Sequence, residues 1–480
     1  MKRITRLTAA MALCVSAAGC NDFLTGPGLS ENPNNPTTVA LQQQFVAMEA
    51  NVFGLFESQF ARLASMYVQQ LSGSNNQQRD WGSRYQISEG DINNQWNNIY
   101  AGGGLVDMRR IQQSAADLGD TRWQGIAQIY EAMLMGMMTS IFGDIAYSEA
   151  VGDNPIPALD PQQDVYAAVQ TLLDNAINNL NGGTAAGNGP GGADLVFQCC
   201  VGSNAALDQV RIDRWVKVAN TLKARFHMHT AEQLGAAAYN AAITAATAGI
   251  SDPPGSVIAA IHQQAPGNFL AFHGNTNDDG NLWTQFLQAR QDMVGNHDFI
   301  TTLINRNDPR LPEYFDPNDG VFRGADRFGL PVAGAPSNVS CGGTTLPCSS
   351  IRRALNFRQP IVTWTENQLI LAEAKFQTGG GSAAALPHVN AVRAALGMGA
   401  LGAVTLQDIM IEKWIAMFQN IEAWNDYKRT CIPALTPAGD PQAAEIPGRI
   451  PYSLNERQNN PNVPLPSAQP DRNWNDPNAC

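Results

Sequence analysis

Apolar residues recur at steps of three and four along much of this chain. Over residues 38–71 they stand at Leu41, Phe45, Met48, Val52 and Leu55, a spacing that predicts a helix. The same spacing predicts helices over about 91–111, 121–141, 161–181, 213–234, 236–248 and 365–377, followed by two more, the second carrying Met410 to Trp424. Three consecutive glycines at 102–104 are expected to break the second helix.

Local signals predict where several of these helices begin. Thr121 with Gln124, and Thr365 with Gln368, fit capping boxes, and Asp160 followed by Pro161 fits an N-cap with proline at the first helical position. The stretch from Trp123 to Ile141 is apolar on most sides, so we expect it to be enclosed, with its methionines filling the core rather than lining a cofactor groove.

The segments between the helices are long. Residues 251–281 and most of 316–360 contain turn formers without periodicity, and long excursions of this kind are usually binding loops. After Thr430 the chain is rich in Pro, Asn and Gln, which predicts ordered coil on the surface. Paired helices suggest degenerate tetratricopeptide-type hairpins, although no clean 34-residue repeat is present, so the pattern predicts a mainly α protein with long loops.

The first nineteen residues have the layout of a secretory signal. Lys2, Arg3 and Arg6 precede an apolar stretch over 7–18 that is too short to span a membrane. Residues 17–20 (AAGC) resemble a bacterial lipobox, which makes Cys20 the expected site of lipidation. Ala17 stands where lipoboxes usually have Leu, so cleavage by an ordinary signal peptidase is the alternative. We expect one domain over residues 20–480.

Composition and charge limit the classes of partner that the protein is expected to bind. The formal net charge is −12, and loss of three basic residues with the signal makes the mature chain more acidic still. No run of Lys and Arg occurs, which argues against nucleic acid as a partner.

The cysteines fit an exported protein. Beyond Cys14 and Cys20, an even set remains, for which disulfides are the expected state in an oxidising compartment: Cys199, Cys200, Cys341, Cys348, Cys431 and Cys480. Six cysteines allow 15 connectivities. A local Cys341–Cys348 bridge is favoured, and a Cys431–Cys480 bridge would hold the C-terminal tail. The adjacent Cys199 and Cys200 could pair with each other or with other partners, and the absence of a Cys-x-x-Cys motif argues against zinc.

Several sequences, in order along nearly the whole mature chain, resemble those of SusD/RagB lipoproteins. The clearest are 412–416 (EKWIA) with 422–429 (EAWNDYKR), 141–150 (IFGDIAYSEA) and 446–452 (IPGRIPY). Further matches are 21–24 (NDFL), 32–34 (NPN), 96–100 (WNNIY), 215–225 (WVKVANTLKAR), 307–310 (NDPR), 371–374 (LAEA), Glu456 and 459–460 (NN). The family does not require the cysteines found here.

The resemblance implies both a fold and a role. The fold would be about four tetratricopeptide-like hairpins supporting an irregular ligand-binding half. The protein would sit, lipid-anchored on the outer membrane and exposed at the cell surface, as a lid over a SusC-like TonB-dependent transporter barrel. Most matched charged residues are expected to be partnered scaffold groups rather than a site: Asp144, Glu373, Glu412, Arg429, Arg449 and Glu456.

A site for neutral sugars needs aromatic faces beside amides and carboxylates. Residues 74–85 and 269–290 offer that mixture, and the resemblance places the ligand pocket at these two regions. The candidate ligand-binding residues are Asn75, Arg79, Asp80, Trp81, Tyr85, Phe272, Trp283, Phe286 and Arg290. For Trp81 and Trp283, packing under a loop is an equal alternative. The pair Asp278 and Asp279 could bind calcium, but it lacks EF-hand spacing, so a solvated acidic turn is favoured.

The chain carries no sequence motif of an enzyme. Gly-x-Ser-x-Gly, His-Glu-x-x-His, Walker and dinucleotide glycine patterns are all missing, and no pair of carboxylates is singled out. We therefore expect a binding protein without metal or cofactor. Its ligand would be an oligosaccharide or, as in RagB-type relatives, a peptide, and a structural or adhesive surface lipoprotein is the third alternative.

Overall fold

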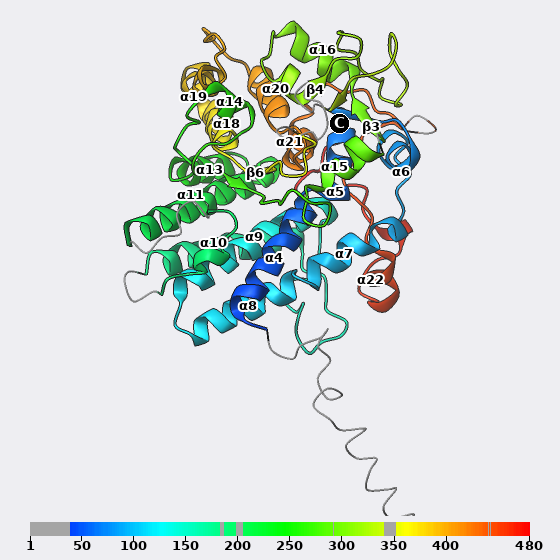
Figure 1. Ribbon diagram of the computed structural model, residues 1–480. Coiled ribbons are helices and arrows are strands. Elements are labelled where there is room, and N and C mark those ends of the chain that lie inside the picture. Colours follow the sequence, from blue (N-terminus) through cyan, green and yellow to red (C-terminus); the bar gives the residue numbers. More distant parts are fainter. Residues whose placement is uncertain are drawn as a thin grey trace, which may run out of the picture. The chain divides into compact units, whose positions relative to one another are not determined.

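Apolar stretches fold mainly into helices in the computed structural model (Figure 1), which describes residues 39–182, 187–197, 205–290, 292–339, 352–439, 441 and 443–480. The helices are α4 (Leu41–Phe56), α5 (Gln59–Tyr67), α6 (Asn76–Gln78), α7 (Asn93–Tyr100), α8 (Leu105–Asp117), α9 (Thr121–Phe142), α10 (Gln162–Leu180), α11 (Ala205–His229), α12 (Ala231–Leu234), α13 (Ala236–Thr247), α14 (Val257–Ile261), α15 (Leu282–Thr284), α16 (His297–Asn305), α17 (Leu311–Tyr314), α18 (Trp364–Lys375), α19 (Gly381–Ala395), α20 (Leu406–Ala416), α21 (Glu422–Thr430) and α22 (Leu454–Asn459).

Two of the predicted helices are each divided in two. The helix expected over 38–71 breaks between α4 and α5, where the Ser58 side chain accepts a hydrogen bond from the Phe60 amide and starts a new helix. The helix expected from Met410 to Trp424 breaks between α20 and α21, where Gln419 adopts a left-handed conformation with φ +64°. The break predicted at the glycine triplet is confirmed, since α7 ends before it and α8 begins after it.

All three predicted helix starts are wrong by one or two residues. Asp120, not Thr121, caps α9 by accepting from the Trp123 amide, and Thr363, not Thr365, caps α18 by accepting from the Glu366 amide. Asp160 does not cap α10. Its carboxylate accepts instead from the amides of Tyr147 and Ser148.

Helices pack against one another in a continuous series, α8 on α9, α9 on α10, α10 on α11, α11 on α13, α13 on α18 and α18 on α19 (Figure 1). Helix α9 is buried along almost its whole length, including Met133, Met135 and Met137, as predicted for core methionines. At Gly136 a Cβ would lie 2.2 Å from the Phe226 ring, so glycine allows α9 and α11 to approach. The mainly α class with tetratricopeptide-like pairs is confirmed.

Three short antiparallel ladders hold the loop regions together. Strand β1 (Leu71–Gly73) pairs with β3 (Met293–Gly295), β2 (Phe269–Leu270) with β6 (Pro360–Val362), and β4 (Phe315–Asp316) with β5 (Asn338–Val339). The β1–β3 and β2–β6 ladders join segments far apart in the sequence, whereas β4–β5 closes the stretch between its own two strands. The excursion predicted at 251–281 is thereby joined through β2 to β6, the strand that precedes α18.

The predicted scaffold charges are all partnered. Glu373 pairs with Arg429, and Glu412 pairs with Arg310 at 2.6 Å. In addition, Asp144 accepts from the Gln162 amide, Arg449 donates to the carbonyls of Phe142 and Pro470, and Glu456 accepts from the Trp96 indole.

The C-terminal coil is held by the predicted Cys431–Cys480 disulfide, which is confirmed. Cys20, the Cys341–Cys348 pair, and Cys199 with Cys200 lie outside the described residues. Within the part of the chain that the structure describes, no helix has the length and apolar character needed to cross a bilayer.

Candidate functional site

The two segments expected to carry the ligand site lie side by side. Strand β1 leads into residues 74–85 and pairs with β3, which follows residues 269–290, so that Gly73 faces Met293. Beyond the ladder, the amides of Ser74 and Asn75 both donate to the Asp292 carbonyl, at 2.9 and 3.4 Å. The Asn76 side-chain amide donates to the Asp292 carboxylate at 2.8 Å. These two segments are about two hundred residues apart in the sequence, and folding brings them together.

A cleft of about 560 Å³ opens where these segments meet the 316–338 excursion. We call it the loop cleft, and it is lined by Ser74, Asn75, Arg290, Val294, Asp316, Pro317, Asn318, Gly329, Leu330, Pro331, Ala335, Pro336 and Asn338. Its volume suits a small ligand, and its amides and charged groups can bond hydroxyls. Two of the predicted residues, Asn75 and Arg290, line it. None of the described lining residues is aromatic, so the aromatic-bearing pocket expected from the sequence is not what this cleft offers.

The ring of Phe286 contacts two arginines. The Arg62 guanidinium sits 3.6 Å from its centroid and that of Arg290 5.2 Å from it. Arg62 is buried, and burial together with the charge of Arg290 lowers its pKa to about 9. The contact with Arg62 covers one face of Phe286, and a ligand contact of this ring stays a prediction.

The other predicted residues are not among the described residues that line the cleft. Trp283 is 0 % exposed, so of its two expected roles it takes packing under the loop. Trp81 and Arg79 lie partly exposed on the π-helical turn Arg79–Ser83, with Asp80 paired to Arg84 at 3.0 Å. The Tyr85 hydroxyl accepts from the Ala438 amide, and burial raises its pKa to about 12. Phe272 lies 5.7 Å from the Arg358 guanidinium.

The acidic turn at 278–279 is held by its own loop. Asp279 accepts from the amide and the hydroxyl of Thr276, and exposed Asp279 has a pKa below its ordinary value because of these bonds. Nearby Asn281 is buried and donates to the Phe357 carbonyl. These bonds fit a turn rather than a shared cation site.

The sequence did not predict the buried carboxylate that holds residues 273–282 in place. Buried Glu57, at the α4–α5 break, accepts from His273 Nε2 at 2.6 Å and from the Leu282 amide at 3.1 Å. It therefore anchors both ends of the loop that precedes α15. Nothing in the apolar pattern marked Glu57, although a carboxylate within a predicted helix between apolar neighbours is a usable signal.

The bond between His273 and Glu57 predicts that the stability of the protein depends on pH. Burial alone would lower the pKa of His273, but the Glu57 carboxylate outweighs it and holds this pKa above its ordinary value. A raised pKa contributes stability that is complete below about pH 6.5 and is lost as pH rises through the folded-state value. The loss of unfolding free energy caused by His273→Gln should therefore be larger at about pH 6 than at about pH 9 in urea denaturation. An equal or larger loss at the higher pH would contradict a stabilising ion pair between His273 and Glu57.

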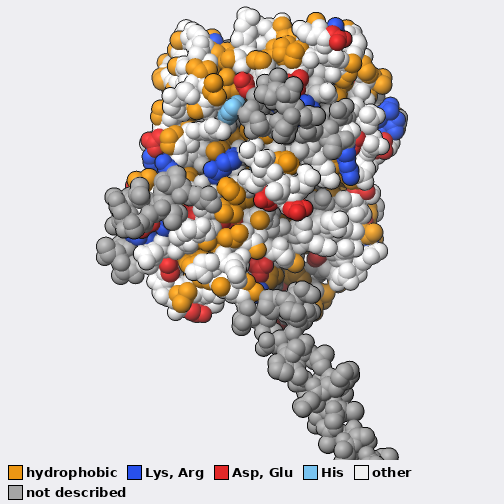
Figure 2. Space-filling view, viewed as in Figure 1, with side chains coloured by type: hydrophobic (Ala, Val, Ile, Leu, Met, Phe, Trp, Pro, Cys, Tyr) orange, Lys and Arg blue, Asp and Glu red, His pale blue; other side chains and the backbone are white. Residues whose placement is uncertain are grey.

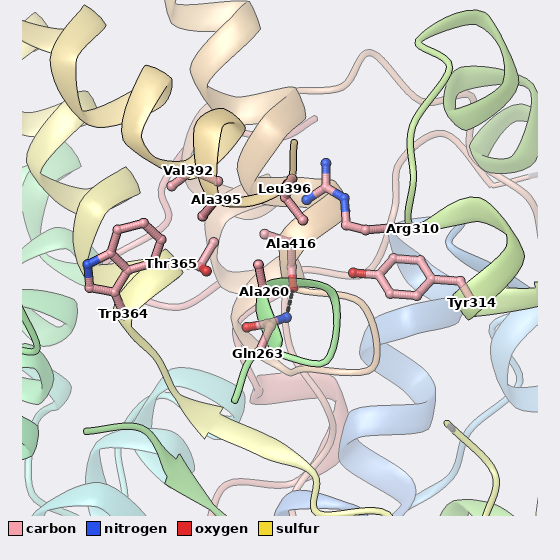
Figure 3. Close-up of a pocket in the computed structure, with 10 residues that line it drawn as sticks. All are labelled: Ala260, Gln263, Arg310, Tyr314, Trp364, Thr365, Val392, Ala395, Leu396 and Ala416. Atoms are coloured by element: carbon pink, nitrogen blue, oxygen red, sulfur yellow. Dashed lines mark hydrogen bonds between the residues drawn. The ribbon is translucent and has the colours of Figure 1, made fainter. Parts of the chain in front are cut away.

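The enclosed void in Figure 3 is not a ligand site. Its volume is about 10 Å³, which is room for one water at most, and Val392, Ala395, Leu396 and Ala416 make much of its wall. Of its polar lining residues, Gln263 already donates to the Ala416 carbonyl, and Arg310 is paired with Asp308 and Glu412. On the outside, Figure 2 shows acidic and basic side chains interspersed over the coloured atoms of the face in view.

Comparison with known proteins gives a consistent family. A SusD-like family model, described as "Starch-binding associating with outer membrane", matches residues 33–453. Similar solved structures include a chitin-binding protein (22 % identity, 92 % of this chain and 100 % of that one, TM-score 0.71) and a chitin-binding SusD homolog from Flavobacterium johnsoniae (19 %, 92 % and 99 %, 0.73). A SusD/RagB family protein from Bacteroides thetaiotaomicron is also similar (19 %, 92 % and 100 %, 0.68). No curated protein sequence matches the chain.

Proposed function

Since this chain belongs to the SusD/RagB family, we propose that it is a cell-surface lipoprotein that binds an oligosaccharide in the loop cleft. It delivers the oligosaccharide to a SusC-like TonB-dependent transporter in the outer membrane. Energy for uptake comes from the transporter, and this protein contributes capture without catalysis. The family model describes starch binding in association with the outer membrane, and this description supports the ligand class and the location.

The observation that carries this proposal is the convergence of polar groups from separate segments on one cleft. Asn75 comes from the segment after β1, Arg290 from the segment before β3, and Asn318 and Asn338 from the excursion around β4 and β5. Hydroxyl-rich ligands need several donors and acceptors at fixed positions. The ladders β1–β3 and β4–β5 fix these positions before a ligand arrives, which reduces the entropy lost on binding.

Arg290 is the group on which binding should depend most. Its side chain is exposed at the cleft, and its guanidinium lies 5.2 Å from the centroid of the Phe286 ring. Arg290→Ala is expected to weaken oligosaccharide binding by at least about tenfold in calorimetric titration, because a hydrogen bond to a charged group contributes roughly 1.5–3 kcal/mol. Arg110→Ala, on the surface of α8, is the matched control and should leave the affinity unchanged. Equal affinities in the two variants would place the ligand elsewhere.

Membrane attachment is part of the proposal and rests on Cys20. Growth with radiolabelled palmitate should label the native chain and not a Cys20→Ser variant, and the label should be found in the outer-membrane fraction. A native chain that is secreted without label would instead point to cleavage by an ordinary signal peptidase.

A peptide is the second candidate ligand. Arg290 and Asp316 place opposite charges on the same cleft, as the charged ends and side chains of a peptide would require. Asp316 is already paired with Arg353 at 3.2 Å, which favours a neutral ligand over a peptide. Binding to neither class would favour the structural or adhesive alternative.

A further inference from the structure

The C-terminal coil forms a second, larger cleft on another part of the fold. This C-terminal cleft has a volume of about 690 Å³, and its walls come from the end of α9, from α12 and from residues 452–477. It shares no lining residue with the loop cleft. Its lining includes the polar and aromatic residues Asp144, Gln233, Tyr452, Asn462, Arg472 and Trp474.

Hydrogen bonds of the neighbouring residues hold the backbone on both sides of Trp474. The neighbouring side chains of Asn473 and Asn475 are 3 % and 6 % exposed and donate at 3.0 Å to the carbonyls of Ser140 and His229. Gln233 of α12 donates to the Trp474 carbonyl at 2.6 Å. The Trp474 side chain, between these two buried asparagines, is partly exposed and lines the cleft. An indole held this way is available to a ligand without further loss of backbone entropy.

The floor of the cleft is equally fixed. The Tyr452 ring stacks on Phe142 with centroids 6.3 Å apart, and its hydroxyl donates to the Asp144 carbonyl at 2.8 Å. The exposed Asp144 carboxylate accepts from the Gln162 amide through Oδ1. Its Oδ2 has no hydrogen bond within the described residues.

The remaining polar groups complete a set that suits sugars. Asn462 is exposed and donates through Nδ2 to the carbonyls of Ile156 and Pro157, which orients its Oδ1 as an acceptor. Arg472 forms ion pairs with Asp476 at 2.8 Å and with Glu445 at 3.3 Å. A cation that is already paired gives no preference for an acidic ligand.

We propose that the C-terminal cleft is a second saccharide site, selective for neutral sugars. The indole of Trp474 takes the apolar face of a sugar ring, while the Asp144 carboxylate and the Asn462 amide accept from its hydroxyls. This is the combination of aromatic, amide and carboxylate groups that the loop cleft does not provide. The proposal does not depend on which ligand the loop cleft binds.

The test uses the mature chain labelled with 5-fluorotryptophan and fluorine NMR, with chitohexaose and maltohexaose as probes up to millimolar concentration. The protein has nine tryptophans, and the Trp474 resonance is the one missing from Trp474→Phe. We expect one of these probes to move that resonance in a saturable way. Asp144→Asn keeps the Oδ1 acceptor for α10 and should weaken this response about tenfold, which is about 1.4 kcal/mol.

Two variants separate this site from the loop cleft and from general effects on the tail. Arg290→Ala, in the loop cleft, and Leu465→Ala, which removes a 61 % exposed side chain of the same coil, should both leave the Trp474 response unchanged. A Trp474 resonance that neither probe moves overturns the proposal, as does a response that disappears in Arg290→Ala. A response in native protein and Arg290→Ala, reduced in Asp144→Asn at an unchanged melting temperature, supports it even if the loop cleft binds no sugar.

Discussion

Glu373→Leu is expected to lower the free energy of unfolding by about 3–5 kcal/mol, the cost of breaking a buried ion pair from one side. Glu373 is 0 % exposed on α18 and faces Arg429 of α21 and Lys413 of α20. Asp426 bonds both cations, at 2.8 Å to Lys413 and 2.9 Å to Arg429. Removing Glu373 leaves two buried cations with one carboxylate. Urea denaturation of the mature protein measures the loss.

The control for this prediction is an ion pair at the surface. Asp252 pairs with Lys217 at 2.9 Å and its side chain is 55 % exposed, so Asp252→Ala should cost about 1 kcal/mol or less. The double variant Glu373→Leu with Arg429→Leu should recover part of the loss, because it removes one of the stranded charges. If Glu373→Leu costs no more than Asp252→Ala, these charges do not join α18, α20 and α21 as described.

Removing the Cys431–Cys480 disulfide is the second change with a large expected effect. The bridge joins residues separated by 49 positions, and the loop-closure entropy it removes from the unfolded chain corresponds to about 4 kcal/mol. It fixes the end of a coil that has little regular structure of its own. Cys431→Ser with Cys480→Ser should therefore lower the melting temperature clearly in calorimetry under non-reducing conditions.

The side-chain bonds of the tail provide the comparison. Asn475→Ala removes the bond to the His229 carbonyl but leaves the bridge, and it should cost about 1–3 kcal/mol. A loss for the double serine variant that is smaller than the loss for Asn475→Ala would show that hydrogen bonds alone hold the coil.

The apolar period predicted the fold well because helix formation depends on burial that the sequence displays. It failed at helix ends, where competing polar groups decide the boundary. Asp120 and Thr121 are both acceptable caps, and only the folded chain shows that the Thr121 hydroxyl donates to the Asn179 carbonyl instead. Likewise Met410 to Trp424 keeps helical spacing across a break, because both α20 and α21 bury their residues on the same core.

The proximity of the two candidate segments was predicted, but the surroundings of their individual side chains were not. The family resemblance placed 74–85 and 269–290 together, and the β1–β3 ladder joins them. The sequence could not show that Trp283 is buried or that the Arg62 guanidinium lies over the Phe286 ring, since both depend on neighbours far along the chain. Trp474 was missed because the tail has no period, and only contacts to α9, α11 and α12 reveal how it is held.

Calorimetric titration of the mature protein against panels of neutral oligosaccharides and of peptides shows whether the loop cleft captures an oligosaccharide. We expect saturable binding of an oligosaccharide that Arg290→Ala weakens and Arg110→Ala does not. Saturable binding of peptides alone, or of neither panel, would contradict oligosaccharide capture in the loop cleft while leaving the family and the fold unchanged.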